Sequence, residues 1–224
     1  MSEPLRVCVD RERQPPEKGL RLALVKGSLW PAGMTIRIHF MDGDPGVHQR
    51  VATAAGEWMQ HANIDLLFGA GPEAEVRISF AIGGSWSHVG TDALRVPHER
   101  PTLNLGWLTP ATLEPELRRV VLHEFGHMLG CIHEHQNPAG GIPWNRQAVY
   151  DYYGGPPNNW DQQKIDHNVF ETYAEDLTCH TSVDRDSIMM YPIPSAFTTN
   201  GYSVGLNTEL SQQDKSFIAE MYPT

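Results

Sequence analysis

One stretch of eleven residues constrains the fold of this chain more than any other. Residues 123–133 read HEFGHMLGCIH. Because an α-helix advances about 100° per residue, His123 and His127 lie one turn apart on one face, where both imidazoles can reach the same metal ion. Glu124 lies beside them and can contact a water at the metal without becoming a ligand itself.

The end of this stretch supplies a third ligand. Gly130 can take a positive φ and end the helix, so that the chain turns back and presents His133. His127 or His133 alone would be read as an ordinary hydrogen-bonded histidine, but the complete pattern H-E-x-x-H-x-x-G-x-x-H is typical of catalytic zinc sites. Three histidines leave the fourth coordination position to water. We therefore expect one catalytic Zn²⁺ held by His123, His127 and His133, with Glu124 as general base.

A second motif follows downstream. Residues 186–192, DSIMMYP, resemble the Met-turn that lies beneath the zinc in metzincin metallopeptidases. The dipeptide HE at 133–134 and the SIMMY of residues 187–191 are most similar to the astacin family. That resemblance implies that Met189 packs beneath the metal and that Tyr191 is a mobile zinc ligand or oxyanion partner. The alternative for Tyr191 is a buried aromatic with a satisfied hydroxyl, and we favour the functional role.

Weaker similarities to the astacin family extend the resemblance from about residue 29 to the end of the chain. They lie at residues 29–33 (LWPAG), 36–40 (IRIHF), 84–90 (GSWSHVG) and 210–214 (LSQQD). The third of these resembles the substrate-facing edge strand of that family. An extended substrate would add as a strand beside Trp86 and Ser87, held by backbone hydrogen bonds. A core or rim position is the open alternative for Trp86.

The resemblance implies an α+β fold of the zincin-like metzincin type, with a mixed twisted sheet, two long helices, a loop-rich C-terminal part and an active-site cleft between the two parts. Alternating apolar residues predict strands at 36–40, 76–80 and 103–105. Apolar residues at helical spacing predict helices from the turn at 42–46 to Ala62, from 112–115 to 130, and at 212–221.

The length of the chain favours one catalytic domain. We assign residues 1–28 to an irregular N-terminal extension and residues 29–224 to a single metzincin-type domain, with subdomains at about 29–130 and 131–224. The formal net charge is −10, and no cluster of Lys and Arg occurs, so nucleic acid is not expected as a partner. No apolar run reaches the roughly 20 residues of a membrane span. We expect a monomer that acts on protein or peptide substrates.

Cysteine use and the N-terminus bear on the compartment. Residues 1–4, MSEP, lack the basic and apolar regions of a secretory signal. Ser85 stands where astacins typically carry a cysteine, and the three cysteines cannot all pair, although a Cys131–Cys179 bridge stays open. These features favour a cytoplasmic location, whereas related families are mostly secreted. Calcium is undecided, since no D-x-D-x-D-G loop is present.

Two departures from the astacin pattern leave roles open. Astacins use the glutamate after the third histidine to anchor a new N-terminus, yet almost thirty residues precede Trp30, so Glu134 has another partner. Cys8 is either an ordinary free cysteine or a thiolate that caps the zinc and keeps the enzyme latent. We place His135 behind the ligands or at the surface, because a fourth imidazole would close the open coordination position.

The function predicted from these motifs is that of a zinc-dependent endopeptidase. One alternative within zinc peptidases takes the third ligand from a later helix, as thermolysin-like enzymes do, and Glu171 is the candidate, although the usual E-x-x-x-D pattern is missing. A second alternative is a binding protein that keeps a zinc-stabilised fold without turnover. The presence of Glu124 and of an open coordination position argues against that alternative.

Overall fold

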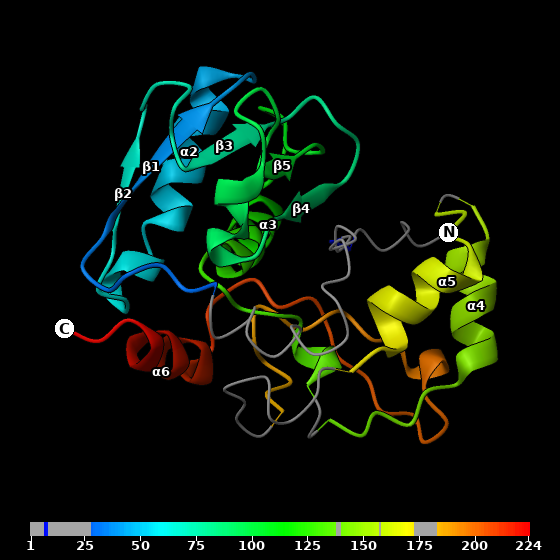
Figure 1. Ribbon diagram of the computed structural model, residues 1–224. Helices are drawn as coiled ribbons and strands as arrows, with labels where there is room; N and C mark the ends of the chain where they lie inside the picture. Colours follow the sequence, from blue (N-terminus) through cyan, green and yellow to red (C-terminus); the bar gives the residue numbers. More distant parts are fainter. Residues whose placement is uncertain (1–6, 9–27, 138–139, 157, 173–182) are drawn as a thin grey trace.

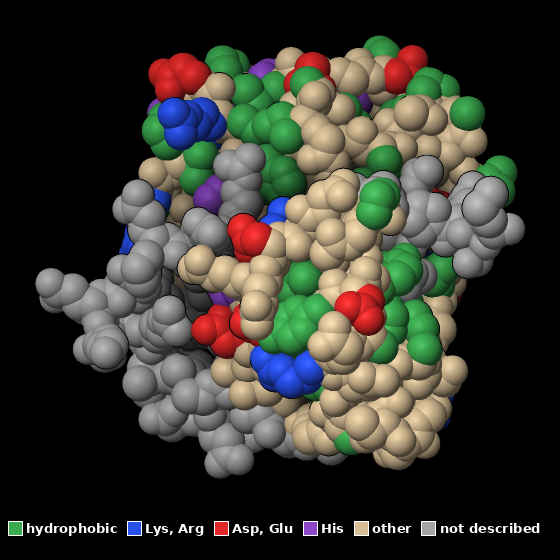
Figure 2. All heavy atoms as spheres, turned by 90° about the vertical axis from the view of Figure 1, so that its right-hand side faces the viewer, with side chains coloured by type: hydrophobic (Ala, Val, Ile, Leu, Met, Phe, Trp, Pro, Cys, Tyr) green, Lys and Arg blue, Asp and Glu red, His purple; other side chains and the backbone are tan. Residues whose placement is uncertain are grey.

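The structure is a computed structural model, and it describes residues 7–8, 28–137, 140–156, 158–172 and 183–224. A sheet with two helices forms one part of the molecule, and short helices joined by loops form the other (Figure 1). Among the described residues, none of the helices combines the length and the apolar character that crossing a bilayer requires. Lys and Arg side chains are few and lie apart on the face drawn in Figure 2.

The sheet has five strands in the order β2-β1-β3-β5-β4. Four of them run parallel to their neighbours, and β4 pairs antiparallel with β5 at the edge. The mixed sheet and the edge position of β4 confirm the expected α+β fold. The strands are β1 (Thr35–Phe40), β2 (Asp65–Phe68), β3 (Val76–Ser79), β4 (Ser85–Ser87) and β5 (Leu103–Leu105).

The strand β2 was not among the predicted strands. In the segment DLLF, the side chain of Leu66 is buried, whereas that of the adjacent Leu67 is 52% exposed. Two neighbouring leucines conceal this alternation, because both score as apolar although only one faces the core. Its pairing with β1 is a long-range contact that periodicity does not reveal.

Two helices, α2 (Pro45–Ala55) and α3 (Glu114–Met128), pack against each other and against the sheet (Figure 1). The prediction that α2 runs to Ala62 is wrong. The helix ends before Gly56, and a 3₁₀ turn, η1 (Trp58–Gln60), follows. Trp58 is nevertheless fully buried and donates its indole N–H to the Leu122 carbonyl at 3.1 Å. The helical spacing of apolar residues therefore continues past the end of α2, because the 3₁₀ turn still directs the Trp58 side chain into the core.

The C-terminal end of α3 is held by residues from both ends of the chain. Gly130 has φ of 101°, as the motif predicts for a residue that ends the helix. The Trp30 indole donates to the Met128 carbonyl at 2.8 Å, and the Tyr222 hydroxyl donates to the Leu129 carbonyl at 2.6 Å. These bonds satisfy carbonyls that no helical N–H can reach.

The remaining elements form the loop-rich part and the final helix. This part has its own hydrophobic cluster, which includes Val149, Tyr153 and Ile193. The predicted final helix at 212–221 is confirmed as α6, with Ser211 and Asp214 forming a capping box. The elements are η3 (Glu134–Gln136), α4 (Arg146–Gly154), α5 (Gln162–Ile165), the π-helix η4 (Asp166–Phe170), η6 (Ser195–Phe197) and α6 (Gln212–Met221).

A glycine on α3 lets the Met-turn approach the helix closely. A Cβ added to Gly126 would lie 2.4 Å from the Met189 sulfur and 3.3 Å from Trp58 Cζ2. Real Cβ atoms do not tolerate the first distance, so the absence of a side chain at Gly126 allows Met189 to pack directly against the helix backbone. The Met-turn and α3 are thereby in van der Waals contact.

We expect Gly126→Ala to lower the free energy of unfolding. The substitution gains about 1 kcal/mol of helix propensity, but displacing Met189 costs roughly 1–3 kcal/mol of overpacking strain. The matched control is Gly83→Ala, where an added Cβ has no neighbour within 4 Å and φ is not positive. Urea unfolding of both variants measures the difference, and a stabilised Gly126→Ala protein would contradict the close packing.

Candidate metal centre

The structure brings the three predicted histidines together at one buried point. His123 and His127 project from α3, and His133 follows the turn at Gly130. Their ligand atoms and the Cys8 sulfur all lie within 4.8 Å of one another, and all four residues are buried. The Nε2 atoms of His127 and His133 are 3.0 Å apart. The three predicted ligands therefore lie close enough together to bind one metal ion.

The buried nitrogen atoms fit a bound cation. His123 Nε2 is buried and has no hydrogen-bond partner among the described residues, a situation that costs free energy unless another group binds the lone pair. Burial also lowers the pKa of His123 well below its usual value, which keeps the imidazole neutral. A neutral imidazole with a free lone pair is the form that binds zinc.

Backbone carbonyls orient two of the imidazoles. His123 Nδ1 lies 2.8 Å from the Ile188 carbonyl, and His127 Nδ1 lies 2.9 Å from the Cys131 carbonyl. Because a carbonyl only accepts, each Nδ1 carries the proton and each Nε2 presents its lone pair to the centre of the cluster. The tautomers needed for metal binding are thus selected by the fold.

A carboxylate on α6 holds the turn that orients His123. Asp214 accepts hydrogen bonds from the Ser187 hydroxyl at 2.7 Å and from the Ile188 backbone N–H at 2.8 Å. Burial raises the pKa of Asp214, and these two hydrogen bonds oppose that shift. From the sequence, Asp214 was expected only as part of the predicted final helix at 212–221. Its contact with the Met-turn has no signal in the local sequence pattern.

The predicted base lies next to the metal ligands. Glu124 is 1% exposed, and its Oε2 accepts from the Cys8 thiol at 3.3 Å. Met189 is buried against α3, as the resemblance implies. The ring of Tyr191 lies beside the cluster, with its centroid 4.5 Å from that of His133.

Cys8 changes one expectation. The fourth coordination position was expected to be open to water, but the structure places the Cys8 sulfur with the three imidazoles. Val7 and Cys8 are both buried, and they share a hydrophobic cluster with Trp86 and Tyr191. The Cys8 sulfur thus lies within reach of the predicted metal position. In the sequence, the only sign of such a role for Cys8 is a single cysteine near the N-terminus. The sequence pattern does not show that this cysteine lies next to the three histidines.

The backbone of the same segment contacts Tyr191. The Tyr191 hydroxyl donates a short hydrogen bond to the Cys8 carbonyl. Trp86 and Ser87 belong to the edge strand β4, and Trp86 is buried in the cluster that holds Val7 and Cys8. The strand expected to receive substrate therefore lies beside residues 7–8. A role of Trp86 and Ser87 in substrate binding stays a prediction.

Other candidate residues lie outside the ligand set. Glu134 accepts from the Asp184 N–H at 3.0 Å and from the Asn137 amide at 3.1 Å, and burial raises its pKa to about 7. Glu171, the alternative third ligand, is half-exposed and pairs instead with His167 at 2.5 Å.

The remaining cysteines and His135 have separate outcomes. Cys131 is a free, buried cysteine among the described residues. Cys179, the other member of the bridge that was left open, lies outside the described residues. His135 is buried behind the ligands and is not one of them.

Comparisons with known proteins agree with this geometry. No family model matches the chain, and no curated protein matches it. Two solved structures of myroilysin are similar to this chain. The first has 45% sequence identity and a TM-score of 0.87, and the match covers 89% of this chain and 98% of that chain. The second has 41% identity and a TM-score of 0.72, and the match covers 99% of this chain and 93% of that chain.

A third solved structure shares the fold. High choriolytic enzyme 1, a hatching enzyme zinc-protease from the medaka fish Oryzias latipes, has 16% identity and a TM-score of 0.60, covering 88% of this chain and 95% of that chain. The identity to myroilysin over nearly its whole length decides the relationship. The chain belongs to the same family as myroilysin, within the astacin-like metzincin zinc metallopeptidases.

Proposed function

We propose that this protein is a zinc-dependent endopeptidase that hydrolyses peptide bonds of proteins, with Glu124 as general base. The observation that carries the proposal is the convergence of three buried imidazoles beside a buried glutamate. The description of the medaka hatching enzyme as a zinc-protease on the same fold supports it. A closed structural zinc site would not need a carboxylate next to its ligands.

The metal ligands, Glu124 and Tyr191 each have a separate role in the proposed hydrolysis. Zinc held by His123, His127 and His133 would lower the pKa of a coordinated water to about 7 and polarise the scissile carbonyl. Glu124 takes the proton of the attacking water and passes it to the leaving amine. Tyr191 donates a hydrogen bond to the oxygen on which negative charge develops.

Substrate binding follows from the sheet. Among the described strands β4 lies at the edge of the sheet, next to β5, and an extended peptide could add beside it through backbone hydrogen bonds. Such binding demands little of the substrate sequence, and specificity is left to side-chain pockets. We expect a general protein or peptide substrate rather than a small molecule.

We also infer that Cys8 keeps the full chain latent. Its sulfur lies within 4.8 Å of the ligand atoms of the three histidines and 3.3 Å from Glu124 Oε2, and its carbonyl accepts from Tyr191. One residue thus lies against the metal ligands, the base and the oxyanion donor. Removal of the N-terminal segment would free all three.

Substitution of the base separates zinc binding from turnover. In a Cys8→Ala background, we expect Glu124→Gln to retain zinc and to lose about 10²- to 10⁴-fold in turnover of denatured casein, because general-base catalysis contributes that much. Glu114→Gln on the same helix, whose side chain is exposed and pairs with Arg50, is the control. Turnover of Glu124→Gln equal to that of the parent would refute the assigned base. Casein left intact by the zinc-loaded parent would favour the binding protein instead.

The identity of the third ligand is tested by a pair of substitutions. We expect His133→Ala to weaken zinc binding by at least the ten- to hundredfold that loss of an outer-shell partner costs, and Glu171→Ala to leave it unchanged. Zinc affinity is measured by competition with a chromogenic chelator. The reverse result would support the thermolysin-like arrangement.

Latency is tested by removal of the thiol. The activity of the full chain scales with the fraction of molecules whose thiol has left the site, so we expect Cys8→Ala to raise peptidase activity about tenfold or more. A second readout does not depend on turnover: cobalt-loaded wild-type protein should show a thiolate charge-transfer band in the near ultraviolet that Cys8→Ala lacks. Equal activity of the two proteins, with no band in either, would rule out the capping role.

A further inference from the structure

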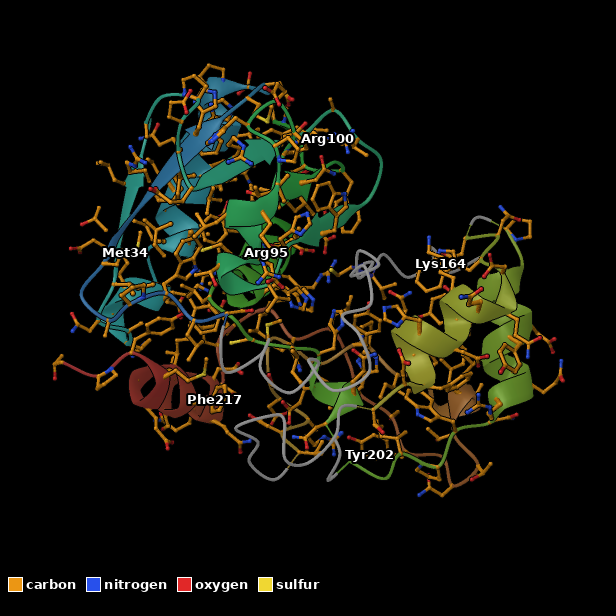
Figure 3. All side chains as sticks on the ribbon, in the orientation of Figure 1. Met34, Arg95, Arg100, Lys164, Tyr202 and Phe217 are labelled. Carbon is orange, nitrogen blue, oxygen red and sulfur yellow. The ribbon has the colours of Figure 1, made fainter. Side chains whose placement is uncertain are left out.

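The residues after the third ligand are anchored on a π-helix. His135 Nε2 lies 2.9 Å from the Asn168 carbonyl, and the Gln136 amide donates to the His167 carbonyl at 2.8 Å. Both accepting carbonyls belong to η4. Lys164 of the adjoining α5, labelled in Figure 3, locates this region. Two side chains of η3 are therefore hydrogen-bonded to the backbone of η4.

The anchored imidazole forms a platform for Tyr191. The rings of His135 and Tyr191 stack with their centroids 4.2 Å apart and an interplanar angle of 30°. On another side, Tyr191 meets His133 at 4.5 Å and 63°, and Trp144 approaches His135 edge-on at 6.4 Å. Tyr191 is 3% exposed. Its phenol is thus confined between a metal ligand and a histidine that is itself fixed to the backbone.

This confinement determines where the hydroxyl points. Aromatic contacts of this kind stabilise the relative orientation of the rings beyond the burial of their area. Rotation of the His135 ring would in addition break its hydrogen bond to the Asn168 carbonyl. The Tyr191 hydroxyl, held in this way, reaches the Cys8 carbonyl next to the metal ligands.

We propose that His135 is a positioning residue for Tyr191. It couples the π-helix to the oxyanion donor and aims the Tyr191 hydroxyl at the place where the substrate carbonyl is attacked. The inference rests on the proposed peptidase function and adds to it a residue that touches neither metal nor substrate. A purely structural histidine would be a core residue whose loss affects stability alone.

A double-mutant cycle distinguishes these roles. His135→Leu removes the stacking ring and the anchor, His135→Phe keeps a ring without the anchor, and Tyr191→Phe keeps the ring without the hydroxyl. All are made in the Cys8→Ala background, with zinc content and melting temperature measured for each. The readouts are kcat and KM for one peptide, and the Kd of a phosphinic peptide, whose phosphinyl oxygens mimic the oxyanion, by calorimetry.

We expect His135→Leu to lower kcat about tenfold or more with little change in KM, since loss of an oxyanion donor costs about 10²- to 10³-fold. In the Tyr191→Phe background the same substitution should cost almost nothing, because the hydroxyl that it positions is already absent. His135→Phe should lie between the parent and His135→Leu. The affinity for the phosphinic peptide should follow the same pattern.

The control is Val149→Ala, which removes packing from the same hydrophobic cluster at a residue of α4. Its effect should be equal in both Tyr191 backgrounds. An equal loss for His135→Leu in both backgrounds, or no loss in the parent, overturns the positioning role. A zinc-loaded Cys8→Ala parent that cleaves no peptide overturns instead the proposed function on which the inference rests.

Discussion

The burial of three imidazoles at one point is the constraint on which the rest of the structure depends. Their ring nitrogens face one another at close range, as the 3.0 Å distance between the Nε2 atoms of His127 and His133 shows. That arrangement is stable only if their outer nitrogens find acceptors and if a cation binds the inner lone pairs. The Ile188 and Cys131 carbonyls supply two of the acceptors. The helix α3, the turn at Gly130 and the Met-turn are therefore arranged so that the outer nitrogens of the imidazoles have hydrogen-bond acceptors.

Residues near both ends of the catalytic domain help to hold the metal ligands in place. The Met-turn carbonyl that orients His123 is positioned by Asp214 of the last helix. The carbonyls at the end of α3 are bound by Trp30, near the start of the described domain, and by Tyr222, near its end. Segments remote in sequence thus determine the geometry of ligands that are only a few residues apart. Loss of such a contact would alter the site as well as the stability of the fold.

The sequence predicted what local geometry determines and failed where long-range contacts decide. The 3.6-residue period and Gly130 were sufficient for the ligands of α3 and for the turn behind them. The same period extended α2 too far, because a buried 3₁₀ turn carries Trp58 inward just as a helix does. Neither the contact of Asp214 with the Met-turn nor the anchoring of His135 on η4 leaves a periodic trace in the sequence. The two contacts join residues that are 26 and 33 positions apart in the chain.

The proposed latency and the proposed catalysis draw on the same contacts around Tyr191. The acceptor of its hydroxyl is the Cys8 carbonyl, and Cys8 shares a hydrophobic cluster with Trp86 of β4, the strand beside which an extended substrate would present its carbonyls. A hydroxyl confined by His135 and His133 can therefore donate to the inhibiting residue and to a substrate from nearly one position. Under the proposed latency, Cys8 needs no site of its own, because it occupies groups already arranged for the reaction. Activation would then require only that Cys8 leave, and the imidazoles, Glu124 and Tyr191 would keep their places.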